Sequence, residues 1–322
     1  MGEVHIVERK IGVIGCGRVG MSYAFSLLHS GICDKLVLID TDQRRVWAEA
    51  EDLRHGLSYL GRITEVWAGD YQDLHDANIV LITAGAAQKE GEDRMALLHR
   101  NADILTEIVG RIVQSGFRGI YLIATNPVDI MTRLCAELSG ADPRRVIGSG
   151  TMLDTARLRF LLSTFFAVDP KNVHAYVLGE HGESEFVPFS QARIGTKEVL
   201  TICREDPSRF PISYLTQVEQ RTVDAAGEII AAKGATCYGI ATALVKLTDA
   251  ILSDEQSIFT LSCRLSGEYG IQDVYLGVPA IVTRSGIRET VTLTLREDEL
   301  TKLKRSAAYL DSMYHRLAPS QV

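Results

Sequence analysis

Three polar segments hold the side chains of this chain that could do chemistry. His181 stands between glycines in Gly179–Gly182, at the expected end of a strand where an imidazole can meet a ligand. A histidine can donate or accept a proton near neutral pH. Asp154 and Arg157 are spaced i and i+3 on an expected helix, so they share one face, although such a pair can also be a plain surface ion pair. The third segment is a polar, glycine-containing loop that ends at Arg94.

A glycine loop near the start predicts a dinucleotide site. Gly15–Gly20 reads G-x-G-x-x-G and lies between an apolar run and an amphipathic stretch. In that context the first glycine permits a tight turn, the second lets a pyrophosphate approach the backbone, and the third lets helix and strand pack. Asp40 follows Gly20 by 20 residues, where a carboxylate accepts hydrogen bonds from the ribose of NAD and repels the extra phosphate of NADP. We therefore predict NAD as the cofactor, held by Gly15, Gly17, Val19, Gly20 and Asp40; Arg44 and Arg45 leave some tolerance for NADP open.

The elements around these segments predict an α/β fold. Short, continuously apolar runs alternate with longer amphipathic stretches through the first half, which is typical of buried parallel strands joined by helices. The expected strands are Lys10–Ile14, Lys35–Ile39, Glu65–Trp67, Asn78–Thr83, Gly119–Ala124 and Arg145–Ile147, and the first expected helix is Arg18–Ser30.

After about residue 150 the pattern changes. We expect strand-like segments at 172–178 and 185–189, a hairpin at 257–283, and helices at 152–166, 212–233, 238–252 and 297–317. The prediction is a doubly wound parallel sheet of the Rossmann type, with an NAD-binding domain at 1–150 and an α+β substrate domain at 151–322.

Composition narrows the class of protein. The 322 residues include 34 basic and 41 acidic side chains, a net charge of −7, which argues against nucleic-acid binding. No apolar run approaches the roughly 18 residues of a membrane span, and the start lacks the pattern of a signal peptide. The six cysteines form no C-x-x-C pair, so we expect reduced thiols, a cytoplasmic location and no metal site. Cys16, inside the glycine loop, raises the hypothesis that oxidation affects cofactor binding.

From about Arg9 to about Arg316 the chain resembles the NAD-dependent L-lactate and malate dehydrogenase family, in particular its bacterial L-lactate dehydrogenases. The resemblance rests on many ordered motifs rather than on one. These are the loop Gly15–Gly20, Asp52–Gly56, Gly69–Tyr71, Gln88–Arg94, Asn126–Asp129, Gly150–Asp154, Arg157 and Gly179–Gly182. Glu183 departs from the aspartate usual in that family, and we expect the neighbouring histidine to remain usable.

The resemblance implies a role for each of these residues. His181 would give a proton to the keto oxygen of a 2-keto acid, and Asp154 would orient the imidazole and stabilise its charged form. Arg157 would bind the substrate carboxylate as a two-pronged fork, which Lys could not reproduce. Arg94 would close over the substrate and polarise the keto group. Asn126 would help to place the nicotinamide and the reacting oxygen.

The resemblance also indicates which 2-keto acid is used. The family position of Gln88 faces the third carbon of the substrate, and malate dehydrogenases carry arginine there. Glutamine cannot neutralise the second carboxylate of oxaloacetate, so we expect pyruvate, giving L-lactate. Thr236 matches a position lining the same pocket and limits bulk. Longer or branched 2-keto acids stay open, because one methylene changes binding by only about 1–3 kcal/mol.

Regulation and assembly are also implied by the resemblance. Arg159 and His174 match the positions that bind fructose 1,6-bisphosphate in allosteric bacterial relatives, across a two-fold axis between subunits. We therefore expect a homotetramer that this sugar bisphosphate activates. The alternative is that Arg159 and His174 are two unrelated basic residues.

Two other classes of protein remain to be weighed. A structural protein that kept only the glycine loop could lose His181, Arg94 or Arg157, yet all three are present. A nucleic-acid-binding use of a dinucleotide fold is disfavoured by the net charge.

Overall fold

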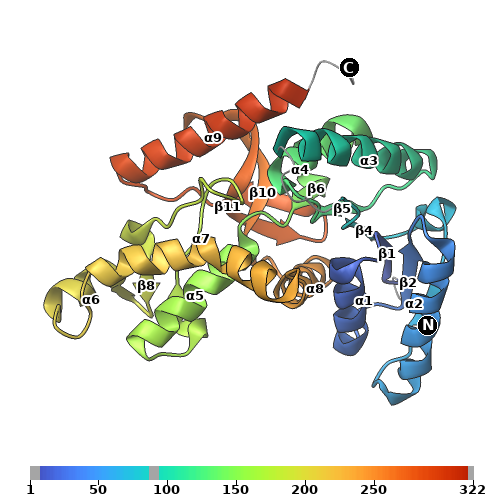
Figure 1. The fold of residues 1–322 in the computed structure, drawn as a ribbon, viewed down its shortest axis with the longest axis horizontal. Helices are drawn as coiled ribbons and strands as arrows, with labels where there is room; N and C mark the ends of the chain where they lie inside the picture. The colour runs from blue at the N-terminus through green and yellow to red at the C-terminus, as the bar shows by residue number, and fades with distance from the viewer. Residues whose placement is uncertain (1–7, 87–93, 318–322) are drawn as a thin grey trace, which may run out of the picture.

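A nine-stranded sheet runs through the molecule and carries the elements that build the site (Figure 1). The computed structural model describes residues 8–86 and 94–317, with the side chain of Arg94 outside the description. Six parallel strands lie in the order β3-β2-β1-β4-β5-β6, which confirms the predicted doubly wound sheet of the Rossmann type. They are β1 (Lys10–Ile14), β2 (Lys35–Ile39), β3 (Glu65–Ala68), β4 (Ile79–Ile82), β5 (Ile120–Ile123) and β6 (Val146–Gly148).

The sheet does not end with the sixth strand. An antiparallel set, β10 (Ile258–Ser266), β11 (Gln272–Thr283) and β12 (Gly286–Thr290), extends it beyond β6, where Ser262 pairs with Gly148. The predicted hairpin is therefore confirmed, and it belongs to the main sheet. A separate small sheet orders β7 (Val173–His174), β8 (Arg193–Ile194) and β9 (Lys197–Glu198).

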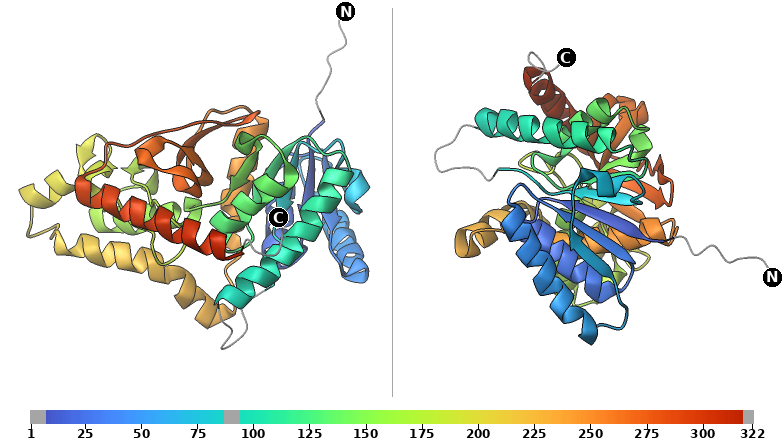
Figure 2. Two further views of the ribbon diagram at one scale, coloured as in Figure 1. Left: turned by 90° about the horizontal axis from the view of Figure 1, so that it is seen from above. Right: turned by 90° about the vertical axis from the view of Figure 1, so that its right-hand side faces the viewer.

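Helices cover both faces of the main sheet (Figure 2). On one face lie α3 (Arg94–Gln114), α4 (Val128–Ser139) and α9 (Glu297–Leu317); on the other lie α1 (Arg18–Ser30) and α2 (Gln43–Gly56). The helix α8 (Tyr238–Leu252) packs on α1, and α7 (Ser213–Lys233) packs on α5 (Met152–Phe166). A short helix, α6 (Val199–Glu205), completes the small-sheet region.

Two hydrophobic cores result from this packing. The larger one surrounds the main sheet and includes side chains from α8 and α9. The smaller one joins α5, β7, α6 and α7 around side chains such as Leu158, Leu162, Phe166 and Val218. One cleft is lined both by loops at the edge of the main sheet and by residues of α5 and α7.

One part of the secondary-structure prediction is wrong. The segments 172–178 and 185–189 were expected as strands, but β7 covers only Val173–His174. In the second segment only Phe186 pairs, through an isolated bridge to Leu178. That bridge closes a loop whose backbone is anchored again by the pairing of Gly179 with Gly277. Long-range contacts, rather than strand ladders, therefore shape this segment.

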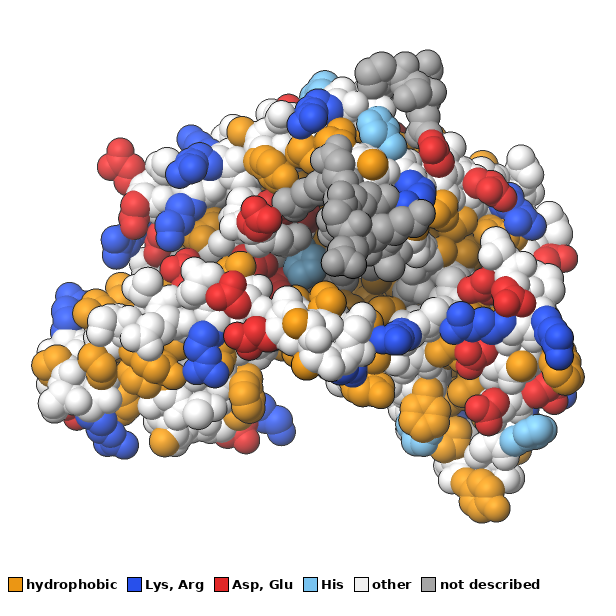
Figure 3. All heavy atoms as spheres, in the orientation of Figure 1, with side chains coloured by type: hydrophobic (Ala, Val, Ile, Leu, Met, Phe, Trp, Pro, Cys, Tyr) orange, Lys and Arg blue, Asp and Glu red, His pale blue; other side chains and the backbone are white. Residues whose placement is uncertain are grey.

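Basic and acidic side chains are interspersed over the face of the molecule seen in Figure 3. Across residues 8–86 and 94–317, no helix has the length and apolar character needed to cross a membrane.

Candidate active site

The glycine loop joins β1 to α1 at the carboxyl edge of the parallel strands. Gly15 has a φ of +99°, and a Cβ built there would lie 2.4 Å from the backbone nitrogen of Ala84. A Cβ at Gly20 would lie 2.0 Å from the carbonyl oxygen of Gly15. A Cβ at Gly17, in contrast, would meet no described atom within 4 Å. Packing therefore requires glycine at the first and third positions, whereas the second borders open space.

Asp40 fastens this loop to the end of β2. Its Oδ2 accepts a hydrogen bond from the backbone N–H of Cys16 at 2.7 Å, and its Oδ1 accepts one from Asp42 at 3.1 Å. Cys16 is fully buried, and burial together with the Asp40 charge raises the pKa of its thiol to about 12. A buried thiol with a raised pKa reacts slowly with oxidants, so the structure argues against the oxidation hypothesis for Cys16.

A cleft of about 770 Å³ separates the glycine loop from α5 and the end of α7. Arg18 spans it at one end, donating from Nη1 to the carbonyl oxygen of Lys233 at 3.2 Å. Of the residues predicted to bind cofactor or substrate, the cleft is lined by Gly17, Val19, Asn126, Arg157, His181 and Thr236.

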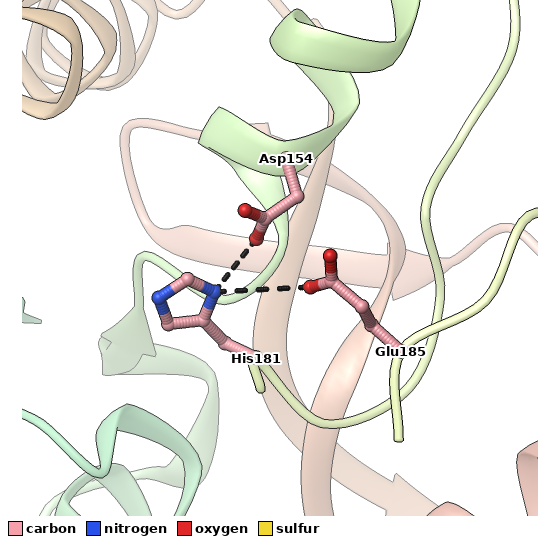
Figure 4. A group of neighbouring side chains, drawn as sticks. All are labelled: Asp154, His181 and Glu185. Atoms are coloured by element: carbon pink, nitrogen blue, oxygen red, sulfur yellow. Dashed lines mark hydrogen bonds and ion pairs between the residues drawn. The ribbon is translucent and has the colours of Figure 1, made fainter. Parts of the chain in front are cut away.

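His181 and Arg157 converge on one buried carboxylate, that of Asp154 (Figure 4 shows the histidine and the carboxylate). Nδ1 of His181 lies 2.7 Å from Oδ2 of Asp154, and Nη1 of Arg157 lies 2.5 Å from Oδ1. Because a carboxylate only accepts, the hydrogen on Nδ1 points to Asp154. The other ring nitrogen, Nε2, points away from both neighbouring carboxyl groups, and the histidine side chain remains 26% exposed.

These contacts set the charges of the pair. Burial alone would raise the pKa of Asp154, but the charges of His181 and Arg157 hold it below its usual range. Burial alone would lower the pKa of His181, but the charge and hydrogen bond of Asp154 raise it to about 9. A pKa of about 9 favours the protonated ring at neutral pH, and the lowered pKa of Asp154 favours its carboxylate form.

The loop that presents His181 is supported by residues that were given no role from the sequence. The backbone N–H of His181 donates to Oδ2 of Asp129 at 2.9 Å, and burial raises the pKa of Asp129 to about 6. The N–H of Glu180 donates to Oγ of Ser306 in α9 at 2.7 Å. Asp129 lies in the motif Asn126–Asp129, which was a signal, but its contact with His181 spans 52 residues and could not be read from spacing.

A second buried carboxyl group, Glu185, was also missed. Its side chain is 4% exposed, and its Oε2 lies 4.0 Å from Nδ1 of His181 (Figure 4). Burial and the charge of Asp154 raise the pKa of Glu185 to about 9. A glutamate four residues after a histidine in a loop has no period that would have singled it out.

The remaining predicted residues fall in three places. Asn101 Nδ2 donates to the carbonyl oxygen of Asn126 at 2.9 Å, which fixes that turn at the edge of the cleft. Arg159 donates from Nε to the carbonyl of Ala175, the residue after exposed His174, so the two basic residues lie on neighbouring elements away from the cleft. Gln88 and the side chain of Arg94 lie outside the described residues.

The described residues fit a bound NAD. The open side of Gly17 leaves room for a phosphate next to the first turn of α1, where backbone N–H groups and the helix dipole favour an anion. Gly17 and His181 line the same cleft, so one elongated ligand could reach both. This is the layout of an NAD-dependent oxidoreductase that transfers hydride next to a protonated histidine.

Comparison with known proteins agrees with this layout. Residues 9–148 match the model of the lactate/malate dehydrogenase NAD binding domain, and residues 151–317 match that of the family's alpha/beta C-terminal domain. The chain belongs to the lactate/malate dehydrogenase family. It is 47% identical over 311 residues to L-lactate dehydrogenase 1 of Peribacillus psychrosaccharolyticus, covering 97% of this chain and 96% of that protein. It is 48% identical over 307 residues to the L-lactate dehydrogenase of Priestia megaterium, covering 94% of each.

Solved structures give the same result. A lactate dehydrogenase from a Medee basin deep-sea metagenome library superposes with a TM-score of 0.94 at 44% identity, covering 97% of this chain and 99% of that one. The minor L-lactate dehydrogenase of Enterococcus mundtii, in its ligand-bound form, gives 0.95 at 39% identity, covering 98% and 100%. NAD is thus the cofactor of this family member, and its chemistry is that of an oxidoreductase.

Proposed function

We propose that this protein is an L-lactate dehydrogenase that interconverts pyruvate and L-lactate. The observation that carries the proposal is the arrangement of His181, Asp154 and Arg157 on the wall of the NAD cleft. When bound, NADH supplies the hydride to the keto carbon. All other steps are those of the protein's own side chains.

His181 supplies the proton. Asp154 holds the Nδ1–H tautomer, so Nε2 is the atom that donates a proton to the keto oxygen and takes it back in the reverse direction. A pKa of about 9 keeps the proton on the ring until negative charge develops on the oxygen. Arg157 lines the cleft next to His181, and its guanidinium is suited to bind the substrate carboxylate.

The charge of this wall fits a monocarboxylate. One negative charge on Asp154 faces two positive charges, on His181 and Arg157, which leaves these three side chains with a net charge of +1. Pyruvate brings one negative charge and balances it, whereas oxaloacetate brings two. Gln88 is expected to favour pyruvate for the same reason, because a neutral amide cannot balance a second carboxylate. Thr236 lines the cleft and is expected to limit the size of the substrate.

NADH oxidation with pyruvate, oxaloacetate and 2-ketoisocaproate tests the proposal, compared as kcat/KM. We expect pyruvate to win by tenfold or more, and Gln88→Arg to move the preference toward oxaloacetate. A preference for oxaloacetate in the unaltered protein would make it a malate dehydrogenase. A preference for the branched acid would assign it to longer 2-hydroxy acids.

We further propose activation by fructose 1,6-bisphosphate in a cytoplasmic homotetramer. The placement of Arg159 and His174 on adjacent α5 and β7 supports the effector site. The six free thiols support a reducing, cytoplasmic location. The activator is expected to lower the KM for pyruvate, and Arg159→Gln with His174→Gln to remove that response while keeping basal activity. An unchanged response in the double variant would contradict the allosteric role, and light scattering at several concentrations tests the tetramer.

The domain division at 150 likewise stays a prediction, which limited proteolysis can test.

A further inference from the structure

The imidazole of His181 has two buried carboxyl groups beside it, where the proposed chemistry uses one. Asp154 and Glu185 approach the same ring nitrogen of His181 from two sides (Figure 4). A ligand atom from each of the three side chains lies within 4.8 Å of the others. Two carboxylates this close cannot both be ionised without a large cost, unless each has its own donor or cation.

The geometry divides the available partners unequally. The hydrogen on Nδ1 of His181 is directed at Asp154 at 2.7 Å, and Arg157 contacts the other oxygen of the same carboxylate. Oε2 of Glu185 lies 4.0 Å from Nδ1, too far to accept the same hydrogen. Asp154 therefore has both cations as direct partners, and a proton on Glu185 would remove the repulsion.

On the far side of Glu185, no described ion pair joins its carboxyl group to a cation. Glu185 also lines a second cavity of about 360 Å³, between its own loop, α7 and α9. Apart from Glu185 itself, two acidic and two basic side chains line this cavity, and Lys302 is already paired with Glu219 at 3.6 Å. They are Glu183, Glu219, Lys302 and Arg305. On the active-site side, besides Asp154, His181 and Arg157, the backbone of His181 binds the buried Asp129.

We propose that Glu185 is a positioning residue that stays protonated in the working enzyme and gives its acid proton to the carboxylate of Asp154. In this arrangement Glu185 holds Asp154 against His181 without adding negative charge. Asp154, His181 and Arg157 together then keep their net charge of +1, which suits the substrate carboxylate. The proposal rests on the roles given above to His181 and Asp154, and it explains why a glutamate can stand beside a cationic acid catalyst without neutralising it.

Glu185→Gln and Glu185→Leu separate a neutral role from a charged one. Glutamine is neutral, like the protonated acid, and can still donate to Asp154, whereas leucine fills the space without a donor. We expect Glu185→Leu to lower kcat for pyruvate reduction about tenfold with less than a twofold change in KM, and Glu185→Gln to recover most of that loss. Glu219→Gln is the matched control, because it removes a carboxylate from the second cavity without touching Asp154 or His181.

The pH profile of kcat/KM for pyruvate reduction distinguishes a neutral Glu185 from an ionised one. If Glu185 is neutral where the upper limb begins, Glu185→Gln shifts that limb by clearly less than one unit, and what shift there is reflects ionisation of Glu185 itself near pH 9. If Glu185 is ionised, removing a negative charge 4.0 Å from Nδ1 lowers that limb by about one unit or more, which would overturn the proposal.

An infrared difference spectrum tests the proton without any activity. Unaltered protein minus Glu185→Gln, at pH 7, is expected to show the C=O stretch of a protonated carboxylic acid, and the Glu219→Gln difference is expected to lack it. A carboxylate band in place of the acid band would overturn the proposal even if Glu185→Leu does not fold. If His181→Gln keeps activity while the acid band is present, the proposed role of His181 fails and the protonation of Glu185 stands.

Discussion

The two halves of the cleft recognise their ligands by different physical means. The cofactor half is made of backbone: a turn with positive φ at Gly15, a close helix–strand contact at Gly20, and open space at Gly17. The substrate half is made of side chains with buried charge, Asp154 with His181 and Arg157. A backbone site tolerates changes of pH and charge but not of volume. A buried charge network has the opposite sensitivities.

The two halves are also held in place by different residues. Asp40 has a structural task in the cofactor half, where it accepts from the N–H of Cys16. In the substrate half, by contrast, Asp129 and Ser306 hold the backbone around His181, so that the ring is placed by contacts from α4 and α9. Substitutions that remove charge should therefore damage the substrate half, and substitutions that add volume should damage the cofactor half.

His181→Gln is expected to have the largest effect. Loss of a positioned general acid typically costs 10²–10⁴-fold, and we expect kcat for pyruvate reduction to fall by about 10³-fold. The Kd of NADH, measured by fluorescence, is expected to change less than twofold, because the glycine loop is untouched. His75→Gln, at an exposed histidine far from the cleft, is the control. Loss of NADH binding along with kcat would contradict the separation of the two halves.

Asp40→Asn tests the negative charge that fastens the glycine loop in the cofactor half. Asparagine can still accept from Cys16, so the loop keeps its anchor while the negative charge disappears. We expect the preference for NADH over NADPH, measured as a ratio of kcat/KM, to fall about tenfold to hundredfold, equivalent to about 1.4–2.8 kcal/mol. The matched control is Asp42→Asn, at the N-cap of α2, where Asn caps as well as Asp. An equal change in both variants would show that the preference is not set at Asp40.

Raising the pH above 9 is expected to lower catalysis about tenfold per unit while leaving NADH binding unchanged. With a pKa of about 9 for His181, kcat/KM for pyruvate reduction should be flat below pH 9 and fall about tenfold per unit above it. Lactate oxidation should rise toward pH 9, because it needs the neutral ring. Binding of NADH should follow neither trend. Asp154→Asn removes the carboxylate that raises the pKa, so its reduction limb should move to lower pH.

The same shift contributes to stability with a defined sign. The pKa of His181 is raised from 6.5 to about 9 by folding, so the folded chain binds this proton more tightly than the unfolded chain. The contribution is fully present below about pH 6.5 and is lost as pH rises through about 9. Thermal unfolding of the unaltered protein and His181→Gln across this range should show melting temperatures that converge with rising pH. A gap that widens would contradict the assignment.

Most of the fold could be predicted because local patterns determine it. The helices α5, α8 and α9 have the predicted bounds, since strong apolar periods define them and Pro170 follows α5 closely. The segments 172–178 and 185–189 were mispredicted because apolar residues there pack between elements rather than in a ladder. Their conformation depends on contacts such as Gly179 with Gly277, which no local pattern contains.

The candidate site also contains residues that the sequence could predict and residues that it could not. The glycine loop and the pair Asp154 and Arg157 could be found by spacing, since their relations are local. Asp129 and Glu185 could not be given roles, because burial next to His181 is a property of the folded chain. Sequence patterns thus indicated the groups proposed to touch ligands and missed the groups that adjust their charge and position.

The smallest expected effect tests the backbone half directly, by comparing two glycines of one loop. Alanine at Gly20 must displace the carbonyl of Gly15, because its Cβ would lie 2.0 Å away, and overpacking of this kind costs about 1–3 kcal/mol. Alanine at Gly17 meets open space and should cost less than about 1 kcal/mol. Melting temperatures at one protein concentration check both values.

The ligand then reverses the order of the two variants. The methyl group in Gly17→Ala projects into the space assigned to the cofactor phosphates, so it should weaken NADH binding although the protein melts almost as before. Gly20→Ala, where it is folded, should lose more stability than affinity. If Gly17→Ala binds NADH normally, the open side of Gly17 does not face the phosphates and the cofactor half needs a different reading. If instead both variants lose only stability, the loop recognises NAD mainly through side chains, and the contrast between the two halves fails.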